Sequence, residues 1–137
     1  MSIWTHVAGT IRIDHLRSLD IKPTPDFDNI FKKFIYDENI DYDVDYENQK
    51  QKWVECNMPK GSEESLDYRV IENPNKSSLC AYTVVIFGDL RDFGKDDVNK
   101  IKEWWKDTLS KFDMVRQAIL QIQPEDGETL ILTEKDI

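Results

Sequence analysis

Residues 80–88, CAYTVVIFG, decide the fold of this chain. They are nearly all apolar and rich in β-branched and aromatic side chains, which predicts a central strand buried on both faces. A strand is predicted at residues 66–72, before the turn cluster at 73–78, and an amphipathic helix is predicted at 96–112, after the buried strand. The apolar stripe of that helix consists of Val98, Ile101, Trp105, Leu109 and Phe112.

The two ends of the chain supply the remaining elements. Residues 3–14 alternate between apolar and polar side chains, which predicts a half-buried strand. A helix is predicted to start at residues 24–26, Thr-Pro-Asp, and its apolar stripe consists of Phe27, Ile30, Phe31 and Phe34. Strands are predicted at 115–123 and 129–133, joined by a hairpin turn whose Asp126-Gly127 pair supplies a positive φ.

This order of elements predicts an α+β, ferredoxin-like two-layer sandwich, βαββαβ plus an extra C-terminal strand. The 137 residues form a single domain, in which residues 36–65 are an acidic insertion and loop region after the first helix. Within the insertion, the alternation at 40–47 and the segment 52–56 favour a hairpin. Two helices are expected to cover one face of the sheet and to leave the other open. Another α+β two-layer sandwich is the principal alternative.

The negative charge is concentrated in two short segments. The chain has 27 acidic and 18 basic residues and a net charge of −9. Residues 37–47 hold six acids and no base, and residues 124–137 hold five acids and one lysine, so the other 112 residues carry a charge of +1. A localised negative field can steer a basic partner, although acidic loops are also often only solvated. Direct nucleic-acid binding is disfavoured because phosphate contact needs clustered Lys and Arg.

No catalytic, metal or cofactor motif is predicted. The spacing of Asp41, Asp43 and Asp45 resembles the opening of a calcium loop, but Tyr46 stands where such a loop needs Gly and Lys52 where it needs Glu. The two His and two Cys are not paired at a ligand spacing, and the cysteines are expected to be free thiols. No apolar run approaches the length of a membrane span, and the N-terminus lacks the features of a signal peptide, so we expect a cytoplasmic location.

Two groups of residues are candidates for binding. The acidic insertion supplies charges and aromatic anchors for a protein partner: Asp41, Tyr42, Asp43, Asp45, Tyr46, Glu47 and Trp53. A ligand rim is predicted on the open sheet face and on the loop after the central strand: Trp4, His6, Arg12, Asp89, Arg91 and Asp92. In this loop Arg91 can bridge Asp89, and Asp92 or Asp96 can cap the following helix.

Three segments, residues 59–68, residues 84–93 and the opening Trp4-Thr5-His6-Val7, resemble a group of small phage and prophage proteins of unassigned function. The resemblance covers about a third of the chain and implies a viral or mobile-element origin. It carries no catalytic residues across. Small acidic phage proteins often act as inhibitors, including anti-CRISPR proteins and DNA mimics, by occupying basic nucleic-acid-binding surfaces.

The sequence therefore favours a non-enzymatic acidic protein, in the cytoplasm of a bacterial host, that engages a basic nucleic-acid-handling protein as an inhibitor. One alternative is a small-ligand or nucleotide-binding domain that uses the open sheet face. A second alternative is a homo-oligomeric structural or accessory phage protein, such as a homodimer.

Overall fold

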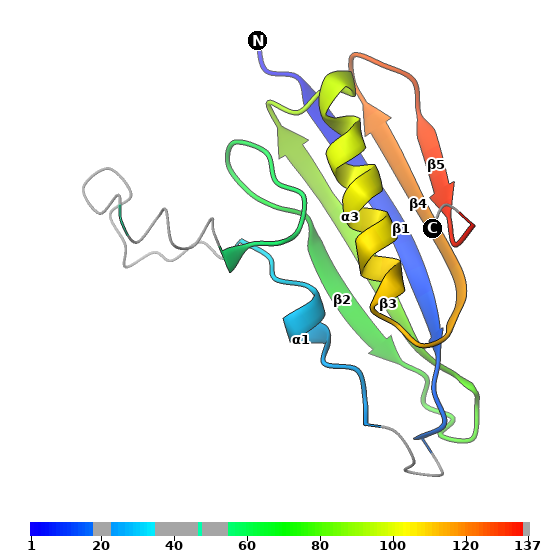
Figure 1. Ribbon diagram of the computed structural model, residues 1–137. Coiled ribbons are helices and arrows are strands. Elements are labelled where there is room, and N and C mark those ends of the chain that lie inside the picture. Colours follow the sequence, from blue (N-terminus) through cyan, green and yellow to red (C-terminus); the bar gives the residue numbers. More distant parts are fainter. Residues whose placement is uncertain (18–22, 35–46, 48–54, 136–137) are drawn as a thin grey trace.

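A single antiparallel sheet organises the chain. The computed structural model describes residues 1–17, 23–34, 47 and 55–135 (Figure 1). The sheet has five strands in the order β2-β3-β1-β4-β5, so the α+β prediction is confirmed. In chain order the elements are β1 (Trp4–Asp14), α1 (Phe27–Ile30), β2 (Asp67–Glu72), β3 (Cys80–Arg91), the 3-10 turn η2 (Lys95–Asp97), α3 (Val98–Ser110), β4 (Val115–Pro124) and β5 (Leu130–Thr133).

Strand β1 lies at the centre of the sheet and pairs with β3 on one side and β4 on the other. Its burial alternates as the sequence predicts, and Thr5, Val7, Ile11 and Ile13 are buried on one face. Ile3, which the same pattern placed on that face, precedes the strand and is 43% exposed.

Helix α3 covers one face of the sheet (Figure 1). Its predicted apolar stripe is confirmed, since all five residues are buried, and Trp105 is fully so. The Trp105 indole N–H also donates to the Thr133 carbonyl (3.0 Å), which ties α3 to the edge strand β5. No helix in the described ranges has the length and apolar character that a membrane crossing requires.

The second face of β3 is not buried, which corrects the prediction for residues 80–88. Val84, Ile86 and Leu90 point toward α3 and are fully buried, whereas Val85 and Phe87 between them are partly exposed. The reason is that α3 lies on one face and no described element lies on the other. The apolar run therefore marks an interior strand, next to the central β1, with one open face.

The first helix is much shorter than predicted, because α1 ends at Ile30. Asp26, rather than Thr24, caps its N-terminus by accepting a hydrogen bond from the Asn29 backbone N–H (3.3 Å). At Phe31 the backbone is already extended, with φ −109° and ψ 93°. The helical stripe predicted through Phe34 is thus wrong beyond its first turn.

Asn57 explains why the helix stops. Its side-chain oxygen accepts from the Lys32 N–H (2.9 Å), its side-chain amide donates to the Ile30 carbonyl (3.0 Å), and its backbone N–H donates to the Lys32 carbonyl (2.8 Å). Further along, the Ser65 hydroxyl accepts from the Phe34 N–H (2.8 Å). The Ile30 carbonyl, both backbone groups of Lys32 and the Phe34 N–H thus find partners distant in sequence instead of continuing the helix.

The turn between β4 and β5 also differs from the prediction. Within the described ranges, only Asp92 (φ 55°) and Gly88 (φ 156°) have a positive φ, so Gly127 does not. The Gly127 N–H donates to the Pro124 carbonyl (3.3 Å), and the Asp126 carboxylate accepts from the Lys95 N–H (2.8 Å). Asp126 therefore serves to join the turn to the start of η2.

The predicted hairpin at residues 40–56 lies almost entirely outside the described residues. At the described end of the insertion, Cys56 and Met58 are buried, and Lys60 and Ser65 form an isolated β-bridge. Cys56 and Cys80 are both free thiols, as predicted.

Candidate functional site

The sheet face opposite α3, called the open face below, carries the candidate site. Because side chains alternate along a strand, the outward residues of β1 are Trp4, His6, Ala8, Thr10 and Arg12. Residues paired across neighbouring strands share a face, so the register extends this set onto β3 and β4. Asp89 and Gln123 flank His6, and Thr83 and Gln117 flank Arg12.

His6 lies between two carboxylates at one end of the open face. Its Nδ1 is 2.7 Å from Asp89 Oδ1, and its Nε2 is 3.0 Å from Glu125 Oε2. The Trp4 backbone N–H donates to the other Glu125 oxygen (3.1 Å). We call His6, Asp89 and Glu125 the His6 clamp, because the three residues join β1, the end of β3 and the β4–β5 turn.

The electrostatics of the clamp favour a charged imidazole. Hydrogen bonds to Asp89 and then to Glu125 raise the pKa of His6 above 6.5. The same contact with His6, helped by the Trp4 N–H, lowers the pKa of Glu125. Only the protonated ring can donate from both nitrogens, so the geometry corresponds to an imidazolium between two carboxylates.

The chemistry available to the clamp is therefore electrostatic. With both nitrogens occupied, the ring has no lone pair to act as a general base. Among the residues that the structure describes, no group of three or more His, Cys, Asp and Glu side chains could hold a metal ion.

The predicted ligand rim is only partly assembled. His6 and Asp89 do meet, and Trp4 reaches the same cluster through its backbone. Arg12 lies six residues further along β1, which is roughly 20 Å at the rise of a strand, so it belongs to the opposite end of the open face.

The loop after β3 uses its charges differently from the prediction. The guanidinium of Arg91 pairs with Glu63 and donates to the Ser2 hydroxyl (3.0 Å), rather than bridging Asp89. Asp97, rather than Asp92 or Asp96, accepts from the Gly94 N–H (3.1 Å) at the start of the helix. Asp92 is exposed, with φ 55°.

Two acidic segments distant in sequence meet at this end of the sheet. The β3–α3 connection and the β4–β5 turn lie side by side at the top of Figure 1, and the Lys95–Asp126 hydrogen bond joins them. Residues 89–97 and 125–128, called the acidic end below, hold seven acidic and two basic residues. The sequence identified the acids of the tail, but nothing in it indicated that residues 89–97 lie beside them.

No family model, curated protein or solved structure matches this chain.

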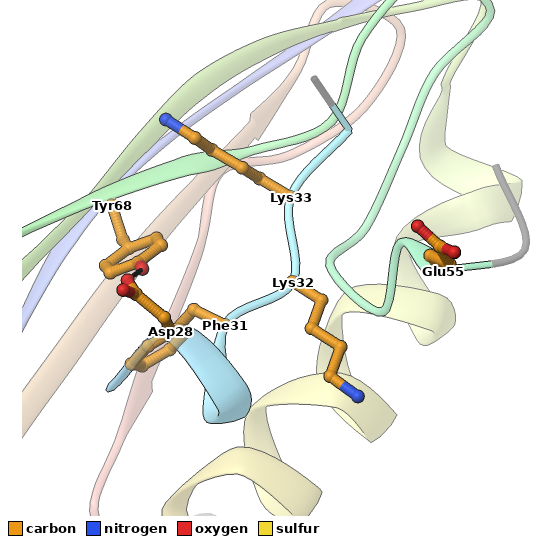
Figure 2. Close-up of a pocket in the computed structure, with 6 residues that line it drawn as sticks. All are labelled: Asp28, Phe31, Lys32, Lys33, Glu55 and Tyr68. Carbon is orange, nitrogen blue, oxygen red and sulfur yellow. Dashed lines mark hydrogen bonds between the residues drawn. The ribbon is translucent and has the colours of Figure 1, made fainter. Parts of the chain in front are cut away.

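A groove beside α1 was not predicted. It has a volume of about 710 Å³ and is lined by Asp28, Phe31, Lys32, Lys33, Glu55 and Tyr68 (Figure 2). The rings of Phe31 and Tyr68 stack with centroids 4.9 Å apart, and the Tyr68 hydroxyl donates to Asp28. Burial, followed by this hydrogen bond, raises the pKa of Tyr68.

Charges of both signs line this groove. Figure 2 shows Asp28, Phe31 and Tyr68 grouped together, with the side chain of Lys32 pointing away from them. Lys33 forms an ion pair with Asp67 (2.9 Å). Asp28 and Tyr68 are 40 positions apart in the sequence. Their contact was not predicted, because it depends on how α1 lies relative to β2.

The predicted partner-binding residues lie outside the described part of the chain, with one exception. Glu47 is described and is exposed. The remaining residues of this group are Asp41, Tyr42, Asp43, Asp45, Tyr46 and Trp53.

Proposed function

We propose that this chain is a non-enzymatic binding protein that engages a basic, nucleic-acid-handling protein and inhibits it. The observation that carries the proposal is the acidic end, where seven acids from two segments distant in sequence gather at one end of the sheet. Clustered carboxylates attract the Lys and Arg residues with which such a partner contacts phosphate.

Residues 37–47 provide a second concentration of charge in the same chain, with six acids and no base. Segments of this kind raise the rate of encounter with a basic surface and oppose the approach of nucleic acid itself. The partner is therefore a protein, and the chain competes with DNA or RNA for its basic surface.

The occupied ring of His6 supports a role in binding rather than catalysis, since neither nitrogen is free to accept a proton. The resemblance to small phage and prophage proteins supports a mobile-element origin and a cytoplasmic site of action in a bacterial host.

We also infer a ferredoxin-like arrangement for the domain. The order β2-β3-β1-β4 and the position of α3 between β3 and β4 support it, with β5 as an added edge strand. Residues 36–65 would then be an acidic insertion between α1 and β2.

Charge reversal on a tagged protein tests the proposed function. One variant reverses Asp96 and Glu128 to Lys at the acidic end, and another reverses Asp41, Asp43, Asp45 and Glu47. The matched control for the first variant reverses Glu103 and Asp107 to Lys on the exposed side of α3.

We expect the wild type and the control to retain a basic nucleic-acid-handling protein from bacterial lysate at low salt. Both reversed variants should retain much less, and high salt or added duplex DNA should displace the protein from the wild type. Equal retention by all four chains, or displacement by neither salt nor DNA, would overturn the proposal.

A further inference from the structure

We propose that the open face is a self-association surface, on which a second copy of this chain docks with its strands reversed end to end. This goes beyond the proposed function and does not depend on it, because it rests on the open face and on Arg12. Asp89 and Glu125 of the His6 clamp also belong to the acidic end, whereas Arg12 and Ile119 do not, so variants at Arg12 and Ile119 test the self-association alone. Three features of the open face carry the proposal.

The first feature is an apolar centre. Phe87, Ala8, Gln121 and Ile131 form one row across the strands, and Val85, Thr10 and Ile119 form the next. Ile119 is 44% exposed and Ile131 is 56% exposed, and no described element covers them. Five of the seven side chains in these rows are apolar, with Thr10 and Gln121 among them, and apolar side chains gathered on an exposed face favour an interaction site.

The second feature is the separation of charge along the face. The His6 clamp places two carboxylates at one end of β1. Arg12 lies at the other end and forms no ion pair within the described ranges; its guanidinium donates only to the Thr10 hydroxyl there (3.3 Å). Arg69, on β2, is paired with Val85 on the Arg12 side of Gly9, and its guanidinium lies over the Phe87 ring (5.9 Å).

The third feature is the spacing of these charges. Gly9 stands midway between His6 and Arg12 on β1. A two-fold axis that lies between the two sheets, over Gly9 and at right angles to the strands, therefore stacks Arg12 of one copy over His6 of the other. Asp89 and Glu125 flank the protonated His6, so each guanidinium meets a clamp of two carboxylates and one imidazolium, with a net negative charge.

The same axis brings the apolar rows together. Packed sheets lie about 10 Å apart with their strands within about 30° of each other, which suits two broad faces of this kind. Phe87 of one copy then stacks on Val85 of the other. A basic partner would complement only the clamp end, whereas a second copy complements both ends at once.

Two charge-reversal variants test this geometry. In the dimer, Arg12 of each copy faces Asp89 of the other, which gives two equivalent contacts. Arg12→Glu places two negative charges at each contact, and Asp89→Arg places two positive charges there. When the two variants are mixed in equal amounts, the introduced glutamate of one chain faces the introduced arginine of the other. The native Arg12 and Asp89 face each other at the second contact, so the mixed dimer regains both attractions. Lys102→Glu and Glu103→Arg are the matched controls, because both residues are exposed on α3, on the opposite side of the sheet.

Sedimentation equilibrium over a concentration series measures the result. We expect twice the 16.2 kDa chain mass for the wild type and both controls, and at least a tenfold weaker dimer for each reversed variant alone. The mixture should return toward the wild-type dimer.

Ile119→Lys tests the apolar centre, because it places a charge there, and it should also dissociate the dimer. Circular dichroism verifies that each variant is folded.

A wild type that stays monomeric at every concentration would overturn the proposal. It would also be overturned if the two reversed variants dimerised as the wild type does, or if mixing them restored no association.

Discussion

At the scale of single residues, His6 performs a joining role on the open face. Its two carboxylate partners are 83 and 119 positions away in the sequence, so one side chain links the central strand to the end of β3 and to the β4–β5 turn. The link depends on the ring being protonated, because a neutral imidazole donates from only one nitrogen.

The His6 clamp predicts a pH-dependent contribution to stability. The folded-state pKa of His6 lies above its ordinary value of 6.5. The contribution should therefore be fully present below pH 6.5 and should be lost as the pH rises through the folded-state pKa. In urea unfolding, His6→Gln should lower the free energy of unfolding at pH 6 and leave it unchanged near pH 9. The effect should be small, because both ion pairs are exposed.

The carboxylates provide the control for this prediction. NMR titration of the wild type should give His6 a pKa above 6.5, and the double variant Asp89→Asn, Glu125→Gln should bring it back toward that value. An unshifted His6 in the wild type would contradict the clamp.

Gly9 is the glycine at which an added methyl group should lower the free energy of unfolding most. A Cβ atom there would lie 2.2 Å from the backbone oxygen of Ile119 and 2.9 Å from a methyl group of Leu120. The backbone of the neighbouring strand cannot give way as a side chain can. We expect Gly9→Ala to lower the free energy of unfolding by about 1–3 kcal/mol, as overpacking does. Ala8→Ser, on the exposed side of the same strand, should change it little.

Alternation along β1 was enough to predict which of its residues face outward, including His6 and Arg12. The partners of those residues could not be predicted, because they depend on strand order and register. Glu125 lay outside the predicted rim for this reason, and Arg91 was paired with Asp89 because they are neighbours in sequence, although its partner is Glu63.

At the scale of elements, the sequence predicts strands better than the first helix. Each strand has its own period-two or apolar pattern, and all five form. Residues 27–34 have a helical spacing of apolar side chains. However, the Asn57 side chain forms hydrogen bonds with the backbone of residues 30 and 32, and the chain is extended from Phe31. The side chain that overrides the local pattern lies 25 residues away from Lys32.

Removing that side chain should loosen the segment after α1. Asn57→Ala deletes two hydrogen bonds to residues 30–32 and leaves their backbone groups without these partners. We expect a loss of about 1–3 kcal/mol in the free energy of unfolding, and faster hydrogen exchange at the Lys32 amide. Asn99→Ala, at an exposed position of α3, is the control and should change neither. Unchanged protection at Lys32 would show that Asn57 does not hold the segment.

At the scale of the whole molecule, the distribution of charge is partly visible in the sequence. The acidic character of residues 37–47 and of the tail can be counted directly. The contact between residues 89–97 and residues 125–128 cannot be predicted in this way. It requires β3 and β4 to lie on either side of β1 and to finish at the same end of the sheet. The separation of the His6 clamp from Arg12 follows from the same topology.

The closely spaced acidic residues should destabilise the folded state by mutual repulsion, and added salt should reduce this destabilisation. The chain carries a net charge of −9, and its acidic end holds seven acids with two bases, so the folded state repels itself at low ionic strength. From 10 to 150 mM NaCl the Debye length falls from about 30 to about 8 Å, which screens this repulsion. Scanning calorimetry near pH 9, where the His6 ion pairs contribute least, should show the Tm rising with salt. A gain of about 1 kcal/mol corresponds to roughly 2–8 °C for a domain of this size. A Tm that falls with salt would contradict this prediction, because local ion pairs would then outweigh the repulsion.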